Sequence, residues 1–324
     1  MGRPEITVIV PTRNRAALLE RTLRSVLAND VDLEIVVVDE ASEDDTVETV
    51  AALADARIRL LRHDRPRGVA GARNHGIAEA RAPWLAFSDD DDLSAPDRLR
   101  SQIAAMTTDA AGWCVTGSVY VDLELDLLRH DRAPVGPDLA ERLRVHNVVP
   151  GGGSAVAVRA DLARELGGFD ERFNGVEDWD LWMRLAEHGL PAAVDRPLLA
   201  YTIHPSGSSR ARDAMRAEVE QLRRLKGLEE PASSSTSLDD WTARLQLRAE
   251  LRAGRRLRPA VRLVRSARAT RLGTTAGLRQ VAAALLAPRG LAGRLDLDRK
   301  RQLPPGWCDE LETWLWSVNR DRRD

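Results

Sequence analysis

Four consecutive aspartates, Asp89 to Asp92, follow the apolar run Trp84–Phe87 after a single serine. Like charges this close repel one another unless a cation lies among them. Asp89 and Asp91, which are separated by one residue, can share a divalent cation. Hard oxygen ligands favour Mg²⁺ or Mn²⁺. A Mg²⁺ with few protein ligands completes its shell with water and with substrate phosphates. The run therefore predicts a metal–diphosphate site in which Asp90 or Asp92 could share the metal; the alternative is an acidic surface turn.

A second acidic pair, Glu177 and Asp178, lies at or near the start of a helix that the sequence predicts in "DWDLWMRLAEHG" and that Gly189 would end. Carboxylates at a helix N-terminus complement the helix dipole, which is one explanation of the pair. The other is a general base, because a carboxylate in a partly closed cleft can take a proton from an attacking hydroxyl. The spacing alone does not choose between them.

Four short apolar runs alternate with helical patterns in the first hundred residues. The runs are Ile6–Val10, Leu33–Val38, Ile58–Leu61 and Trp84–Phe87, and the helical patterns cover 15–28, 46–54 and 70–80. The runs are continuously apolar, as expected for strands covered on both faces. Ser42 and Asp45 form a possible capping box before the second helix. The alternation predicts an α/β fold with a mostly parallel central sheet.

Polar clusters follow three of these runs: "PTRN", "DEASEDD" and "SDDDD". Ligands of open α/β sheets bind at the carboxyl ends of the strands, so we expect the clusters to form one site. Asp39, after the second run, has the position in which such folds place an acid against a nucleoside. The first run lacks GxGxxG and the chain lacks a Walker A sequence, which argues against NAD, FAD and P-loop nucleotide sites. Basic groups such as Arg73 would help to hold the diphosphate.

Later segments are less regular. The residues from Trp113 to Leu125 alternate as one strand does, and Pro150–Arg159 has the pattern of a flexible loop that enters another strand. Residues 230–240 have the composition of a linker. They would separate a catalytic domain, residues 1–229, from a basic and mainly helical extension, residues 241–324.

The net charge of −2 hides a basic segment, because residues 241–302 hold 16 Arg or Lys against 3 Asp or Glu. Such a segment could draw the protein to an anionic membrane surface, or could be a solvated or packed arginine-rich surface. We expect no nucleic-acid partner. The two cysteines, Cys114 and Cys308, have no metal-binding spacing and are expected to be buried thiols in a reducing compartment. No run approaches the ~18 apolar residues of a membrane span, and we expect a cytoplasmic protein.

Five segments occur together in an informative order: "TVIVPTRNRAALLERTLRSVL", "EIVVVDEASEDDT", "GVAGARNHGI", "WLAFSDDDD" and "GGFDERFNGVEDWDLWMRLAEHG". In this order they resemble the family 2 glycosyltransferases, inverting enzymes with the GT-A fold. The resemblance extends from Ile6 to Ser209. It implies a metal-dependent enzyme, using Mg²⁺ or Mn²⁺, that moves a sugar from a nucleotide diphosphate donor to a hydroxyl of a glycan, a lipid-linked or a small-molecule acceptor.

The resemblance also implies roles for individual residues. Pro11, Thr12 and Arg13 would border the nucleotide, Asp39 would contact the base, and Arg73 would lie near the nucleoside or the diphosphate. A second group would do the chemistry: Asp89 and Asp91 would form the DxD motif with Asp91 as the direct metal ligand, Asp178 would be the catalytic base, and Glu177 would support it. His204 would contact the metal or the diphosphate, or be structural; the other five histidines form no readable pattern.

Two alternative functions stay open at this level. A sugar-phosphate nucleotidyltransferase could use a similar sheet and would release pyrophosphate, although "PTRNRAALL" lacks the glycines usual near the N-terminus of such enzymes. A binding protein with a degenerate cleft could act through its basic tail, although the intact acidic clusters argue against it.

Overall fold

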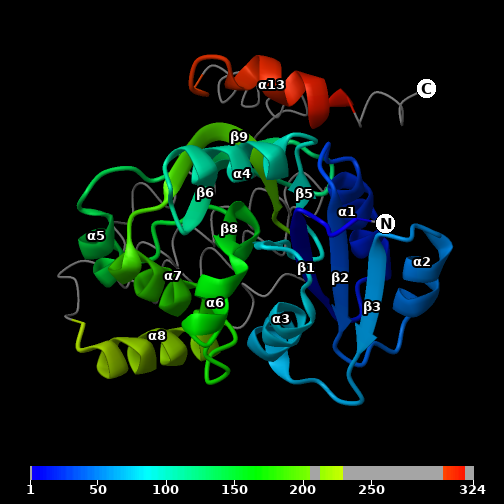
Figure 1. Ribbon diagram of the computed structural model, residues 1–324, viewed down its shortest axis with the longest axis horizontal. Coiled ribbons are helices and arrows are strands. Elements are labelled where there is room, and N and C mark those ends of the chain that lie inside the picture. The colour runs from blue at the N-terminus through cyan, green and yellow to red at the C-terminus, as the bar shows by residue number, and fades with distance from the viewer. Residues whose placement is uncertain (1, 205–211, 229–301, 318–324) are drawn as a thin grey trace, which may run out of the picture.

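All four apolar runs predicted as strands lie side by side in one sheet (Figure 1). The computed structural model describes residues 2–204, 212–228 and 302–317. In this part of the chain the sheet has nine strands in the order β3-β2-β1-β4-β8-β6-β9-β5, with β7 paired to β6. The strands are β1 (Ile6–Thr12), β2 (Leu33–Asp39), β3 (Ile58–Arg62), β4 (Trp84–Phe87), β5 (Leu93–Ser94), β6 (Trp113–Val121), β7 (Leu127–Asp131), β8 (Val156–Arg159) and β9 (Ala192–Thr202).

The first half of the sheet is parallel, since β1 pairs with β2 and β4, and β2 pairs with β3. Ile6, Val8 and Val10 pack with helices α1 and α4, whereas Ile9 packs with α3 and α7. The helices are α1 (Ala16–Leu27), α2 (Thr46–Ala52), α3 (Gly68–Glu79), α4 (Arg98–Thr108), α5 (Leu139–Val145), α6 (Ala160–Glu165), α7 (Glu177–His188), α8 (Arg212–Lys226) and α13 (Trp307–Trp314). Strands buried on both faces confirm the predicted α/β fold.

A glycine sets how closely α3 approaches the sheet. A Cβ added at Gly76 would lie 2.4 Å from Cγ2 of Ile9, so only glycine allows the helix to lie this close to β1. Arg73, one turn earlier on α3, is buried. The close contact at Gly76 thus places the Arg73 guanidinium near the carboxyl ends of the strands.

The direction of the sheet changes between β4 and β8. β8 runs antiparallel to both β4 and β6, while β6 and β9 form the longest ladder and are parallel. The single strand predicted from Trp113 to Leu125 is wrong in extent, because β6 ends at Val121 and the chain returns as β7. Asp122 forms this turn by accepting the N–H of Asp126 at 2.9 Å, a local bond that competes with strand extension.

Of two local predictions, the capping box is wrong and the segment that enters a strand is confirmed. The capping box at Ser42 and Asp45 does not form: α2 begins at Thr46, and its N-cap residue, Asp45, makes no side-chain capping bond. Ser42 instead accepts the N–H of Asn14 and donates its own N–H to Asp39, both at 2.9 Å, and so ties the loop after β2 to the loop after β1. Further along, Pro150–Arg159 does lead into a strand, but through the buried 3₁₀ turn η1 (Gly152–Ala155).

Helix α13 packs on the sheet near β9, at the top of Figure 1. Trp307, Leu311 and Leu315 are buried against residues of β6 and β7. The Trp307 indole N–H donates to the carbonyl of Asp195 at 3.2 Å. The predicted linker and residues 241–301 of the basic extension lie outside the described residues. The C-terminal residues that are described therefore belong to the same core as the sheet.

The two cysteines differ in burial. Cys114 and Cys308 are both free thiols, but only Cys114 is buried, and burial raises its pKa to about 12. The prediction that Cys308 is buried is wrong, because the buried side of α13 is formed by Trp307 and Leu311. Among the described helices, none has both the length and the apolar character that a bilayer crossing requires.

Removing the Trp307 side chain tests the docking of α13. Trp307→Ala should lower the free energy of unfolding by about 3–5 kcal/mol, the usual cost of truncating a buried tryptophan. Urea unfolding followed by circular dichroism measures this loss. Thr313→Ala, on the exposed side of the same helix, should stay within about 0.5 kcal/mol of the unmodified protein. Equal losses in the two variants would contradict the packing of α13 on the sheet.

Candidate active site

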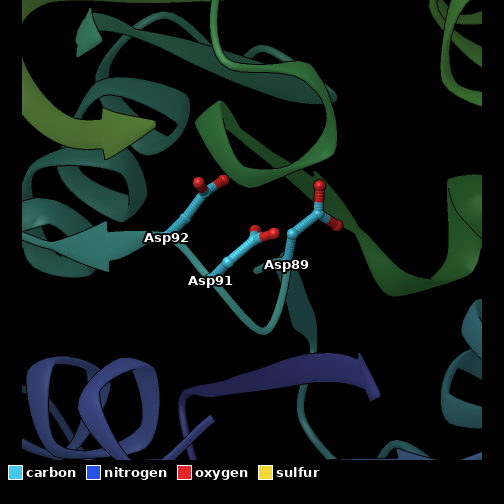
Figure 2. Close-up of side chains that lie close together, drawn as sticks. All are labelled: Asp89, Asp91 and Asp92. Carbon is cyan, nitrogen blue, oxygen red and sulfur yellow. The ribbon is translucent and has the colours of Figure 1, made fainter. Parts of the chain in front are cut away.

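The four aspartates form a turn between β4 and β5, at the edge where the parallel strands end. Ligand oxygens of Asp89, Asp91 and Asp92 lie within 4.8 Å of one another. Their side chains project to the same side of the turn (Figure 2). Asp90 points elsewhere and accepts the Thr12 hydroxyl at 2.8 Å. The structure therefore groups the two predicted DxD residues with Asp92, and separates Asp90 from them.

This group suits a divalent cation. Asp92 is fully buried, and one of its oxygens accepts the N–H of Thr202 at 2.9 Å while Oδ2 has no hydrogen-bond partner. A buried carboxylate oxygen without a partner is costly unless a cation neutralises it. Burial and the charge of Asp91 raise the pKa of Asp92. His204, also buried, lies with Nε2 2.8 Å from Oδ2 of Asp91, at the edge of the same group.

Two arginines that the sequence did not single out also act on the aspartates, Arg15 by direct contact and Arg98 through its charge. Arg15 places Nη1 2.8 Å from both Asp90 and Asp91. Arg98 is buried beneath the turn, where its guanidinium donates to Ser94 at 2.8 Å and to the carbonyl of Ser154. Burial lowers the pKa of Arg98 to about 10, although Asp92 opposes the shift. The only sequence signal for Arg15 is its place in "PTRNRA", where Arg13 is an equal candidate.

Arg73 joins the two acidic clusters. Its guanidinium donates to Asp89 at 2.6 Å and to Glu177 at 2.7 Å, and lies 5.1 Å from the centre of the Phe169 ring. Burial works against its charge, but the carboxylates of Asp89 and Glu177 outweigh burial and raise the pKa of Arg73. The residue predicted beside the diphosphate thus forms a bridge between the aspartate turn and the start of α7.

Asp178 and Glu177 occupy the first turn of α7 but have different surroundings. Asp178 is half-buried, accepts the N–H of Trp179 at 2.6 Å, and lies 3.4 Å from the amide nitrogen of Asn147. Glu177 is buried, its Oε1 accepts the Arg73 guanidinium, and its Oε2 has no hydrogen-bond partner. Burial raises the pKa of both carboxyls, that of Glu177 to about 7. Asp178 is the more accessible of the two to a ligand.

The glycines before β8 form part of the wall between the clusters. A Cβ at Gly152 would lie 3.4 Å from the Asp178 carboxylate, and one at Gly153 would lie 2.9 Å from the Arg73 guanidinium. Gly152 also has a φ of +55°, which favours glycine. Small residues here leave room beside Asp178 and let the backbone approach Arg73.

The predicted nucleotide residues lie at the ends of β1 and β2. Pro11 and Thr12 are buried at the end of β1, and Arg13 is exposed just beyond it. Asp39 is buried at the end of β2, with Oδ2 3.5 Å from the guanidinium of Arg62. The structure therefore places all four at the same edge of the sheet as the aspartate turn.

A histidine network that the sequence did not reveal lies beside Asp39. His63 Nδ1 contacts the carboxylate of Glu40, and His63 Nε2 lies 2.8 Å from Nδ1 of His75. The other Glu40 oxygen accepts the N–H groups of Arg67 and Gly68, each at 2.6 Å. Glu40 therefore holds the loop between β3 and α3.

Comparison with known proteins agrees with this geometry. Residues 7–167 match the sequence model of the family described as "Glycosyl transferase family 2". The chain is 47% identical over 110 residues to the succinoglycan biosynthesis protein ExoO of Rhizobium meliloti, covering 34% of this chain and 31% of that protein. It is 33% identical over 236 residues to the validoxylamine A glucosyltransferase of Streptomyces hygroscopicus subsp. jinggangensis, covering 60% and 54%. The chain thus spans only about a third of the length of ExoO and about half of the length of the glucosyltransferase.

Two solved structures share the fold. S. aureus TarS, residues 1–349, in complex with UDP superimposes with a TM-score of 0.55 at 18% identity, covering 76% of this chain and 71% of that one. The mannosyltransferase PcManGT from Pyrobaculum calidifontis, in complex with GDP-Man and Mn²⁺, gives a TM-score of 0.52 at 24% identity, covering 92% and 85%. At these identities the likeness establishes the fold alone.

The raised pKa of Glu177 predicts how stability depends on pH. Burial raises this pKa from 4.5 to about 7, so the contribution of the carboxyl to stability is complete below about pH 4.5 and is lost as the pH rises through about 7. We expect Glu177→Gln, compared with the unmodified protein, to gain up to about 3 kcal/mol of relative stability over this range. Urea unfolding without added metal, at about pH 5 and about pH 8, measures the difference.

The control for this experiment is Glu187→Gln, which changes an exposed glutamate of the same helix. Its stability difference from the unmodified protein should be the same at both pH values. A Glu177→Gln difference that also stays constant would contradict the raised pKa.

Proposed function

Since residues 7–167 belong to glycosyl transferase family 2, and the chain has the GT-A fold, we propose that the protein is a metal-dependent inverting glycosyltransferase. It would move a sugar from a nucleotide diphosphate donor to an acceptor hydroxyl. One observation carries the proposal: Arg73 joins the three-carboxylate group at Asp89 to the Glu177–Asp178 pair at 2.6 and 2.7 Å. A cation site and a base are then parts of one site at the carboxyl edge of the sheet.

The donor would lie along the ends of β1, β2 and β4. Asp91, with Asp89 and Asp92, would hold Mg²⁺ or Mn²⁺, which when bound neutralises charge on the departing nucleoside diphosphate. His204 would complete this region beside Asp91. Support comes from the orphan oxygen of Asp92, and from the fold shared with the mannosyltransferase that binds GDP-Man and Mn²⁺. Pro11, Thr12, Arg13 and Asp39 would border the nucleotide.

The chain's own residues supply the base. Asp178 would take the proton of the acceptor hydroxyl as that oxygen forms its bond to the anomeric carbon, while the bond from this carbon to the diphosphate breaks. Attack from the side opposite the leaving group inverts the anomeric centre. Burial raises the pKa of Asp178, which makes the carboxylate a stronger base. Glu177 would act through Arg73 as a positioning residue.

The relatives point to classes of acceptor. The curated relatives are a succinoglycan biosynthesis protein and a validoxylamine A glucosyltransferase. They support an acceptor hydroxyl in polysaccharide, glycolipid or natural-product glycosylation. The chain spans about half of these relatives or less, so their substrates are a guide for an acceptor panel.

Two substitutions should separate donor binding from chemistry. Asp91→Asn should abolish the Mn²⁺-dependent thermal stabilisation by UDP or GDP, because it removes a metal ligand. Asp178→Asn should keep that stabilisation but slow sugar transfer by about 10²–10⁴-fold, the usual contribution of a general base. The measurements are a thermal-shift titration of nucleoside diphosphates and release of nucleoside diphosphate from nucleotide sugars with an acceptor panel.

The outcomes discriminate among the alternatives. Transfer that survives both EDTA and Asp178→Asn would contradict the assigned roles. Release of pyrophosphate from a nucleoside triphosphate and a sugar phosphate would identify a nucleotidyltransferase instead. A protein that binds no nucleotide with either Mn²⁺ or Mg²⁺ would point to the binding-protein alternative.

We further propose that the protein acts in the cytoplasm, peripherally at anionic membrane through the basic segment of residues 241–302. Arg252, Arg255, Arg256 and Arg258 changed together to Gln should weaken binding to phosphatidylglycerol vesicles about tenfold or more, because each charge near the surface contributes about 1 kcal/mol. Substitution suits this test better than truncation, since α13 beyond the segment packs on the sheet. Vesicle sedimentation measures binding, and neutral phosphatidylcholine vesicles are the control; unchanged binding would end the membrane proposal.

A further inference from the structure

Arg15 lies where it can hold two aspartates that have different roles. It is the N-cap residue of α1, and its Nη1 is 2.8 Å from Oδ1 of Asp90 and 2.8 Å from Oδ2 of Asp91. Oδ2 of Asp90 accepts the Thr12 hydroxyl. Asp90 is thus held on both oxygens by the β1–α1 segment, whereas Asp91 belongs to the carboxylate group that suits a cation.

The contact with Asp91 conflicts with a divalent cation at the same carboxylate. Oδ2 of Asp91 already meets both Arg15 and His204, each at 2.8 Å. A cation bound there would repel the guanidinium across a few ångströms of partly buried space, where screening is weak. The contact between Arg15 and Asp90 has no such conflict, because Asp90 points away from the group.

The side chain of Arg15 is also the most accessible of the three. It is 24% exposed, against 6% for Asp90 and 11% for Asp91, so a ligand entering the site can reach it. A guanidinium presents its N–H donors as a planar fork that matches phosphate oxygens, and contact with a carboxylate at one corner is compatible with phosphate at another. Arg15 therefore has one contact that can stay in place, with Asp90, and one that a cation could displace, with Asp91. Its remaining N–H donors suit phosphate oxygens.

We propose that Arg15 is the resident counter-charge of Asp91 and exchanges partners when the metal and the donor bind. It leaves Asp91 to the cation, stays anchored on Asp90, and contacts the diphosphate of the donor. Asp90 then serves as the anchor of Arg15 and is not a metal ligand. This inference rests on the proposed function, since it assigns a positioning role at the same site.

The exchange predicts opposite changes in two binding constants. Arg15→Gln should bind Mn²⁺ alone about threefold to tenfold more tightly, because a competing cation is gone. In saturating Mn²⁺ the same variant should bind the nucleoside diphosphate about tenfold or more weakly, because a charged hydrogen bond to phosphate is lost. Titration calorimetry measures both constants, and the electron paramagnetic resonance signal of free Mn²⁺ checks the first.

Two further variants make the result decisive. Arg15→Lys keeps the charge without the fork, so its Mn²⁺ affinity should resemble that of the unmodified protein while its nucleotide affinity falls. Arg24→Gln removes an equal charge from the exposed surface of α1, where Arg24 pairs with Glu20, and should change neither constant.

Other patterns overturn the exchange. If Arg15→Gln weakens Mn²⁺ and nucleotide binding together, Arg15 only supports the fold of the site. If it changes neither constant, Arg15 does not take part. Failure of the unmodified protein to bind Mn²⁺ and nucleoside diphosphate would instead contradict the proposed function, so the two failures are distinguishable.

Discussion

The structure depends on arginines that neutralise a run of four carboxylates, of which Asp90 and Asp92 are buried and Asp89 and Asp91 are half-buried. Arg15 from the start of α1 pairs with Asp90 and Asp91, Arg73 from α3 pairs with Asp89, and the buried charge of Arg98 from α4 also acts on Asp92. Charges withdrawn from water are tolerated only when they are paired and hydrogen-bonded. Asp90 shows how incomplete this pairing is, because burial and Asp91 raise its pKa to about 7 against the opposing charge of Arg15. Three of the four carboxyl groups are thus paired with two arginines, which suits a site that accepts a cation.

The site lies beside β4, where the sheet also changes from parallel to antiparallel pairing. The parallel half places the ends of β1, β2 and β4 at one edge and contributes Arg15 and Arg73. The second half contributes Asp178 and His204. The aspartate turn also follows β4, which lies on the other side of β1 from β2 and β3. The strand order thus reverses between β1 and β4, the kind of position at which open α/β sheets bind ligands.

Residues after His204 support the start of α7. Glu218 of α8 accepts the N–H groups of Asn174 and Gly175, at 3.0 and 2.8 Å, just before Glu177. Lys226 pairs with Asp180 in the first turn of α7 at 2.8 Å. Helix α8 therefore holds both the loop that leads to the proposed base and the helix that carries it.

The sequence by itself determined the four strands of the parallel half, the helices between them and the edge at which polar residues gather. Ile6–Val10 and Leu33–Val38 are continuous β-branched runs whose local pattern is enough to predict buried strands. The spacing of Asp89 and Asp91 predicted a cation site for the same local reason. Only the tertiary structure decided that Asp92 joins this group while Asp90 turns to Thr12. It also decided that Arg15 reaches the turn while Arg13 is exposed. The half-buried position of Cys308 likewise follows from how its helix packs. Arg73 and Glu177 are 104 residues apart in sequence, and contacts over such separations depend on how helices pack on the sheet, which no local pattern of residue types encodes.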